Sequence, residues 1–529
     1  MPAGTKQEEV LSTEKRRRCH FMTSNHGDEM DKRLLWMAFA LALAGLVLEK
    51  GQASAWQKDP DSRVDPAKVV TSTLLPTPDV TLGDEDTTIA GIADTIVGAD
   101  DTMSDPPDPP SSGTTLWVDN TPLDGDCPQA TFTSIQAAVN ASGPNDTVKV
   151  CPGTYAEQVQ IVGHMHDGLR LESLTPLAAT IKWPPMDTPL TEHVLVHVSD
   201  ADRVSIRGFT ISGPFNSGGC SDDRHEGVRF ENAFDGRVDH NYLTLIRNSD
   251  PLLWGCQQGD AVAIGQRLPH QGPPFGLPAS ARVDHNVIDR YQKNGVQAVN
   301  PGTFADVRNN TITYDQSETA FIVFRAAPNG VVVFREAAAT VEQNIISGNH
   351  WTVPLSTGII LDEAPPGSSI VDHNQIFDND SGIESDTQTG LEISHNSVSS
   401  NVADAITLCG DVTQGCGPAR QIILRKNDIA NNGGSGILLL GADSNLLKSN
   451  HIQNNGTAAG DTTDGIRVDV NSTNNQILDN HMSANLHHDC HDDSSGAGSG
   501  LPPTANTWTG DQGDTQNRAG LCKFATTTP

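Results

Sequence analysis

The chain has 529 residues, few aromatic side chains (5%) and a formal net charge of −32, with a sequence pI near 4.7. Because so acidic a chain repels nucleic acid and anionic membrane surfaces, we expect neither as a partner. The same charge attracts cations such as Ca²⁺, or serves only to keep a secreted protein in solution.

The N-terminal part predicts export. Lys32-Arg33 precede an apolar run and a small-residue cleavage site at Ala53-Ser54-Ala55. This pattern is typical of a signal peptide over residues 30–55. Met30 is a natural start for it, which would make residues 1–29 an over-extended N-terminus, although Met1 as the true start stays open. An uncleaved signal anchor is the alternative. We expect no membrane span in the mature chain and a secreted protein, extracellular or periplasmic.

The next segment predicts a linker. Residues 56–113 are rich in Pro, Asp and Thr, a composition typical of a disordered, flexible connection. We expect the folded domain to follow over residues 114–525. Near its start, residues 133–141 predict a short amphipathic helix with Thr133 as its N-cap.

Cysteine usage agrees with an oxidising compartment. Of the nine cysteines, Cys19 precedes the signal peptide. The other eight lie close in sequence as four pairs, which are Cys127 with Cys151, Cys220 with Cys256, Cys409 with Cys416, and Cys490 with Cys522. Four local disulfides are therefore expected, although spacing alone does not prove the pairing.

A repeat dominates the rest of the chain. Its unit is an apolar residue, two variable residues, Asn, one variable residue and another apolar residue, preceded by a short strand that usually opens with Gly-Val or Gly-Ile. Where no insertion intervenes, the period is about 22 to 24 residues. The repeated asparagines are Asn241, Asn286, Asn310, Asn344, Asn374, Asn396, Asn427, Asn450 and Asn480.

This repeat predicts an all-β fold, a right-handed three-sheet parallel β-helix solenoid with an N-terminal capping helix. No single unit can bury its apolar side alone, but units stacked at the strand spacing of roughly 4.8 Å enclose one core. Asparagines that recur in register can bond one another as a ladder. A leucine-rich repeat would need more Leu, and a propeller would need a longer period.

From about Leu116 to Cys522 the chain resembles the pectin-lyase-like superfamily of right-handed parallel β-helix proteins. The segments 126–138 (DCPQATFTSIQAA) and 150–155 (VCPGTY) resemble the amino-terminal cap of secreted bacterial members. That group includes relatives of a periplasmic nitrous-oxide-reductase accessory protein. The superfamily contains lyases, hydrolases, epimerases and non-enzymes, so the resemblance predicts the fold rather than an activity. The signature motifs of alginate epimerases, polygalacturonases and pectate lyases are missing from this sequence.

In enzymes that this chain resembles, substrate lies along one sheet. We expect that sheet to be the one that the Gly-Ile strands of successive coils form. Alternation turns one set of its residues outward. The set includes Arg229, Glu231, Gln297, Ile360, Asp362, Glu384 and Asp386.

Asp362, Glu384 and Asp386 are expected within roughly 5 Å of one another on adjacent coils. Three such carboxylates either bind Ca²⁺ or raise one another's pKa. Ca²⁺ bridging to a uronate would permit β-elimination with Arg325 or His350 as the base. The alternative is that these acids cap turns on a solvated sheet.

Long insertions at 213–226, 249–281, 325–340 and 349–357 are candidates for the walls of a binding groove. Arg229, Trp254 and Trp351 are the candidate substrate-binding residues, the tryptophans by stacking on sugar rings. The alternative is that each tryptophan covers an apolar patch of its own loop.

Two histidine patterns suggest metals. The repeated Asp-His-Asn triplets at 239–241, 284–286 and 372–374 lie at the Asn turn, away from the expected groove, and are interpreted as solvated turns. The cluster of His487, His488 and His491 has the ligand types of a copper or zinc site.

Three functions stay open. The favoured one is non-catalytic binding of an acidic polysaccharide or cell-surface glycan. The second is a pectate-lyase-like, Ca²⁺-dependent polysaccharide lyase, which would make the protein an enzyme. The third is a periplasmic metal-handling accessory protein.

Overall fold

The computed structural model describes residues 113–121, 127–184, 193–220, 224–268, 275–314, 327–351, 355–365, 367–386, 390–412, 416–456 and 463–524. The expected signal peptide and the linker over 56–113, apart from its last residue, lie outside these residues, as does Arg325. None of the described helices is long and apolar enough to cross a bilayer.

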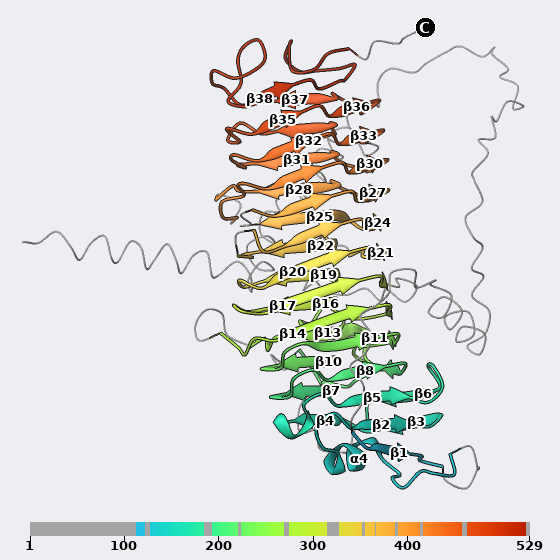
Figure 1. Ribbon diagram of the computed structural model, residues 1–529. Helices are drawn as coiled ribbons and strands as arrows, with labels where there is room; N and C mark the ends of the chain where they lie inside the picture. The colour runs from blue at the N-terminus through green and yellow to red at the C-terminus, as the bar shows by residue number, and fades with distance from the viewer. Residues whose placement is uncertain are drawn as a thin grey trace, which may run out of the picture.

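Within the described residues the strands form three parallel sheets, and each coil adds one strand to sheet C, then one to sheet A and one to sheet B (Figure 1). Sheet A has 14 strands. They are β1 (Thr115–Val118), β2 (Thr147–Val150), β5 (Arg170–Ser173), β8 (Ser205–Arg207), β11 (Gly236–Asp239), β14 (Ser280–Asp284), β17 (Phe304–Arg308), β20 (Ala338–Glu342), β23 (Ile370–Asp372), β26 (Glu392–Ser394), β29 (Ile423–Arg425), β32 (Leu446–Lys448), β35 (Gln476–Leu478) and β38 (Thr507–Thr509).

Sheets B and C have 12 described strands each. Sheet B contains β3 (Gly153–Ala156), β6 (Ala179–Lys182), β9 (Thr210–Ser212), β12 (Tyr242–Thr244), β15 (Val287–Asp289), β18 (Thr311–Thr313), β21 (Ile345–Ser347), β24 (Gln375–Phe377), β27 (Ser397–Ser399), β30 (Asp428–Ala430), β33 (His451–Gln453) and β36 (His481–Ser483). Sheet C contains β4 (Val159–Val162), β7 (Val194–Ser199), β10 (Glu226–Glu231), β13 (Asp260–Ile264), β16 (Asn294–Val299), β19 (Asn329–Phe334), β22 (Thr357–Asp362), β25 (Ser381–Asp386), β28 (Ile406–Cys409), β31 (Ile437–Leu440), β34 (Ile466–Val468) and β37 (Cys490–Asp492).

The helix α4 (Ile135–Ala141) covers the N-terminal end of the coil, packing against β1, β2 and β4 (Figure 1). Its buried side chains are Ile135, Ala138 and Val139. The predicted N-cap at Thr133 is wrong by one residue, because the Ser134 hydroxyl accepts from the Ala137 N–H at 3.2 Å. Two short 3-10 helices, η1 (His164–His166) and η2 (Pro251–Leu253), lie in connections.

Apolar side chains at equivalent positions stack into the core. In sheet A one such column is buried from β11 to β38, and each of its residues pairs in register with its neighbour on the next strand. It contains Val238, Val283, Val307, Val341, Val371, Ile393, Leu424, Leu447, Ile477 and Trp508. Stacking removes from water the apolar surface that each short strand alone would expose.

The nine repeated asparagines form one ladder at the turn between sheets A and B. At a typical step the Asn396 Oδ1 accepts from the Asn374 N–H at 2.9 Å and from its Nδ2 at 2.9 Å. The Asn374 Nδ2 also donates to the Val341 carbonyl at 2.8 Å. The ladder therefore satisfies backbone groups that the turn would otherwise leave buried and unpaired.

A second ladder, which the sequence analysis did not identify, lies at the turn between sheets B and C. The Asn401 Oδ1 accepts from the Asn379 N–H at 3.1 Å and from its Nδ2 at 3.1 Å. Each member lies five residues after an asparagine of the first ladder, a spacing that the sequence alone could have revealed. The members are Asn349, Asn379, Asn401, Asn432, Asn455 and Asn485.

Four disulfides join the cysteines that are neighbours in sequence. The pairs are Cys127–Cys151, Cys220–Cys256, Cys409–Cys416 and Cys490–Cys522. Cys490 opens β37, the last strand of sheet C, so its bond to Cys522 fastens the C-terminal end of the coil.

Candidate functional site

The outer face of sheet C carries one row of side chains along the coil. Strand register aligns Arg229, Ala263 and Gln297, and continues through Val332 and Ile360 to Glu384. The N-terminal half of the row is covered rather than open, since Arg229 is 8% exposed and Gln297 is 0% exposed. These two side chains are therefore covered, whereas the neighbouring Arg267 and Lys293 are half-buried.

Arg229 is held inside the molecule by carboxylates. Its Nε donates to Glu226 Oε2 at 2.6 Å, and an Nη donates to Glu231 Oε2 at 3.2 Å. Glu231 also pairs with His197 Nε2 at 3.0 Å. Because two carboxylates already neutralise it, Arg229 is not a ready substrate-binding residue as the sequence had suggested.

The two tryptophans also differ from the expectation that they offer open stacking surfaces. Trp254 is buried, its Nε1 donates to the Asn248 carbonyl at 2.7 Å, and the Arg247 guanidinium lies 4.2 Å from its ring centre. Trp351 is half-buried and packs against the main core. Trp254 therefore stabilises its own loop, the alternative that the sequence left open, whereas sugar stacking by Trp351 stays a prediction.

Four cations instead gather over β10 to β19. Arg224 and Arg335 both act electrostatically on Arg267, and Arg224 and Arg267 both act on Lys293. Burial first, and these neighbouring positive charges second, lower the pKa of Arg267 well below its ordinary value and that of Lys293 to about 7. Asp260 opposes both shifts without cancelling them.

The cation group contains donors that lack acceptors. Arg267 donates through an Nη to Gln297 Oε1 at 3.3 Å. Within the described part of the chain, however, the Arg267 Nε and the Gln297 Nε2 are buried without a hydrogen-bond partner. Buried donors normally have acceptors, so these two favour a ligand that supplies oxygen atoms. Sequence analysis placed Arg224, Arg267 and Arg335 in the groove loops but did not single out Lys293.

The expected carboxylate cluster lies further along sheet C. Register sets Asp362 beside Asp386, whereas Glu384 aligns with Ile360, two positions away. Burial, then the Glu384 and Asp362 charges, raise the pKa of Asp386 well above its ordinary range. Burial also raises the pKa of Glu384, with the Asp404 charge adding to the shift, while a hydrogen bond from Thr357 opposes it.

Asp404, which was not predicted from the sequence, belongs to the same cluster because its charge acts on Glu384. Burial raises the pKa of Asp404 itself to about 6. Buried acids that repel one another hold protons near neutral pH unless a cation compensates them. Ca²⁺ on Asp362, Glu384 and Asp386 stays a prediction.

His350, one of the two expected bases, lies between two carboxylates. Its Nδ1 lies 2.8 Å from Asp380 Oδ1 and its Nε2 lies 3.2 Å from Asp378 Oδ1. The hydrogen bond to Asp380, outweighing burial, raises its pKa. An imidazole that donates from both nitrogens has no lone pair for a proton, so this pairing opposes the role of a base, and His350 as the base stays a prediction.

In the C-terminal histidine cluster, Asp464 joins two of the three expected histidines. His488 Nδ1 and His491 Nδ1 lie 3.2 Å from the two oxygens of Asp464, which is buried, and 3.3 Å from each other. These three residues have the types and spacing of a metal-ligand set. His487 is exposed and its ring lies 6.5 Å from that of His488, outside the set.

Three parallel sheets wound around one core, with asparagine ladders at the turns, make this chain a right-handed parallel β-helix protein. Residues 279–516 match the family model described as periplasmic copper-binding protein (NosD). This agrees with the resemblance to the accessory-protein group over a little under half of the chain. No curated protein matches the chain.

Several solved structures are similar to it. XylC in complex with xylose is 10% identical, with 75% of this chain and 86% of that chain covered and a TM-score of 0.49. The A-module of mannuronan C-5 epimerase AlgE4 from Azotobacter vinelandii is 15% identical, with coverages of 72% and 88% and a TM-score of 0.38. The Dettilon tailspike protein is 15% identical, with coverages of 75% and 66% and a TM-score of 0.42.

Proposed function

We propose that this protein binds an acidic polysaccharide outside the cytoplasm, over the outer face of sheet C between β10 and β19. The observation that carries the proposal is the group of Arg224, Arg267, Lys293 and Arg335, four cations gathered in a chain whose net charge is −32. Burial first, and neighbouring positive charges second, lower the pKa of Arg267 and Lys293, so a carboxylate ligand would stabilise their charged forms.

The chemistry of the site fits a uronate. Arg267 offers a forked guanidinium that matches a carboxylate in shape, and Gln297 offers an amide donor for a sugar hydroxyl beside it. Both side chains belong to adjacent coils, since β13 pairs with β16. A polymer that follows the coil axis would therefore meet equivalent positions on successive strands. Export fits this role because the four disulfides require an oxidising compartment.

Binding of polygalacturonate and alginate, measured by calorimetry against a neutral glucan, tests the proposal. We expect Arg267→Gln and Lys293→Met each to weaken binding about tenfold, the value of one charge-assisted hydrogen bond. Arg282→Gln is the matched control, because Arg282 lies on sheet A and pairs with Asp306 at 3.2 Å. Equal binding of the neutral glucan, or equal losses in the control, would overturn the proposal.

The same samples report on catalysis. A rise in ultraviolet absorbance from an unsaturated product, dependent on Ca²⁺ and lost in Asp362→Ala and Glu384→Ala, would identify a lyase in place of a binding protein. Binding without product on any uronan would support the non-catalytic role.

Metal handling is a second candidate, favoured by the Asp464, His488 and His491 set and by the description of the matching family model. Burial by itself lowers the pKa of His491, but its bonds to Asp464 and Asp493 outweigh burial and raise it. Arg467 donates to Asp464 Oδ2 at 3.0 Å, so a bound metal would compete with this guanidinium.

Copper titration followed by electron paramagnetic resonance tests the second candidate. We expect His488→Asn and His491→Asn to remove one bound equivalent. His487→Asn is the matched control because this neighbouring imidazole lies outside the set. If all three variants bind as much copper as the natural chain, this candidate fails.

A further inference from the structure

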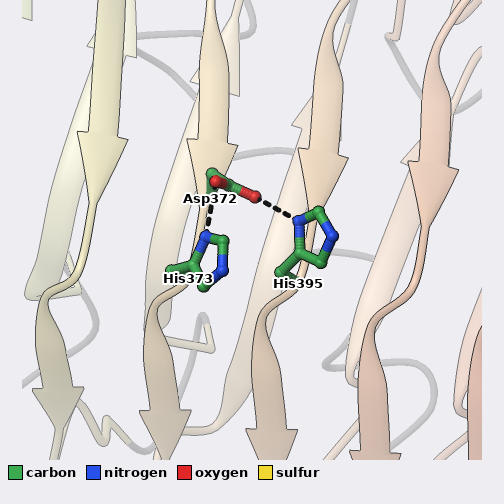
Figure 2. A group of neighbouring side chains, drawn as sticks. All are labelled: Asp372, His373 and His395. Atoms are coloured by element: carbon green, nitrogen blue, oxygen red, sulfur yellow. Dashed lines mark hydrogen bonds and ion pairs between the residues drawn. The ribbon is translucent and has the colours of Figure 1, made fainter.

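At the turn between sheets A and B, the imidazoles of His373 and His395 both contact the carboxylate of Asp372 (Figure 2). Asp372 ends β23, and its Oδ2 lies 2.6 Å from His373 Nδ1. On the next coil, His395 Nδ1 lies 2.9 Å from Asp372 Oδ1. The two rings stack with centroids 4.7 Å apart and an angle of 15° between their planes.

Backbone geometry fixes this arrangement. His373 and His395 have φ of 54° and 52°, the left-handed conformation, and each directly precedes an asparagine of the first ladder. Because the ladder holds the two turns in register, both side chains leave the backbone in the same direction. The sequence interpretation of a solvated turn overlooked His395, which follows a serine and so falls outside the Asp-His-Asn pattern.

We propose that Asp372, His373 and His395 bind a divalent transition-metal ion of the zinc or copper class. The three ligand atoms lie within 4.8 Å of one another, and two imidazole nitrogens with one carboxylate oxygen are a ligand set that such ions prefer. The side chain of His373 is 57% exposed, so water can complete the coordination shell. To bind a metal ion through Nδ1, each imidazole would carry its proton on Nε2.

A second pair of stacked histidines occupies the same turn position, directly before asparagines of the first ladder, but its aspartates have different partners. The rings of His240 and His285 stack with centroids 5.1 Å apart, but each imidazole bonds the aspartate before it, at 2.9 and 2.8 Å. Asp239 is already paired with Arg207 at 3.2 Å and with Arg237 at 3.1 Å. A metal ion there would have to displace guanidinium groups.

Asp372 has a different environment. Its oxygens bond the two histidines and the Ser394 hydroxyl, the latter at 2.7 Å, and no arginine or lysine of the described chain pairs with it. The neighbouring charges are Glu342, which aligns with Asp372 on the preceding coil, and Lys426, which follows His395 in the column. Glu342 is itself paired with Arg308 at 3.2 Å. Among the described residues, the carboxylate of Asp372 is therefore available to a cation without displacing a guanidinium group.

Cu²⁺ titration with electron paramagnetic resonance, and Zn²⁺ competition by calorimetry, test the site in the whole protein. The double variant His373→Asn with His395→Asn is expected to fold, because Asn309 occupies the same column position with φ of 53°. We expect this double variant to bind one fewer equivalent of Cu²⁺ and to lose the spectral coupling to two nitrogens. We expect Asp372→Asn to weaken binding of that Cu²⁺ ion at least about tenfold.

The matched control is His240→Asn with His285→Asn, which should retain every equivalent. Circular dichroism melting confirms that each variant is folded. If the double variant at 373 and 395 binds as many equivalents as the natural chain, or the control loses the same one, the proposal is overturned. Glycan binding should be unaffected throughout, because this turn lies off sheet C.

Discussion

The guanidinium of Arg267 lies over the face of Phe334, 4.7 Å from the ring centre. Arg335 approaches the same ring at 5.4 Å. The negative face of an aromatic ring attracts cations, so Phe334 lets two like charges share one site. This contact links the end of β19 to the residues that follow β13, and it places positive charge where a glycan carboxylate would bind.

Replacing Phe334 by leucine should therefore weaken uronan binding without changing the net charge. A cation–π contact contributes about 1 kcal/mol when it is still partly exposed to water, as that of Arg267 is, so we expect the Kd to rise about fivefold. Calorimetry with polygalacturonate measures this. Phe377→Leu, at an exposed position on β24 of sheet B, is the control and should leave the Kd unchanged. An unaltered Kd for Phe334→Leu would show that the ring does not position the arginines.

Uronan binding should weaken as pH rises through about 7, because the pKa of Lys293 is lowered to about 7 and its charge is lost above that value. The ligand stays ionised over this range, so only the protein changes. Comparing Kd at pH 6 and pH 8.5, we expect about a tenfold difference. Lys293→Arg, which remains charged, should flatten the profile, and a flat profile in the natural chain would contradict the assignment.

The stability of the free protein should change in the opposite direction. The pKa of Lys293 is lower in the folded state than its ordinary value of 10.5, so the unfolded chain binds more protons between the two values. The contribution of Lys293 to the free energy of unfolding therefore rises as pH increases from about 7 toward 10. Urea unfolding of the natural chain and of Lys293→Met, compared across this range, isolates that contribution.

Interrupting the first asparagine ladder should be strongly destabilising. Asn396→Ala leaves the Asn374 N–H and side-chain amide without their acceptor, and the Val371 carbonyl without its donor at 2.9 Å. Each orphaned buried group costs about 1 to 3 kcal/mol, so we expect a loss of at least about 3 kcal/mol. The midpoint of urea unfolding measures it. Asn471→Ala, at an exposed asparagine, should shift the midpoint little.

Asp511, which follows Asn480 at the end of that ladder, should make the free energy of unfolding fall as pH rises. Asp511 Oδ1 accepts from the Asn480 N–H at 2.9 Å and from its Nδ2 at 2.8 Å, and burial raises the pKa of Asp511 to about 7. The folded protein therefore holds a proton that the unfolded chain has released between about pH 4 and 7. This lowers the free energy of unfolding, by an amount on the order of 3 kcal/mol, as pH rises over that range.

Asp511→Asn removes the titrating group and keeps an oxygen for Asn480. The pH slope of the variant should be shallower than that of the natural chain, with Asp404, whose pKa is raised to about 6, contributing equally to both. Thermal unfolding at pH 4.5, 5.5 and 7 gives the two slopes. Parallel slopes would contradict the raised pKa.

Sequence alone determined the coil. The nine asparagines and the apolar column of Val371 and Ile393 recur because each coil must fill the same core and satisfy the same turn, so the information is local and repeated. The second ladder is equally encoded, because each of its asparagines lies five residues after an asparagine of the first. The pairing of His373 with His395 followed from the same period once the turn was placed in register.

Only the tertiary structure decided what covers sheet C. Arg224, Arg267 and Arg335 come from insertions of unequal length, and Lys293 from the residue before β16, so no period relates them. Likewise, nothing near His350 in sequence showed that Asp378 and Asp380, on the following coil, would bind both of its nitrogens. Charges interact through space rather than along the chain, and loop insertions follow no repeat. The repeated scaffold can therefore be predicted from the sequence, whereas the site can be located only in the tertiary structure.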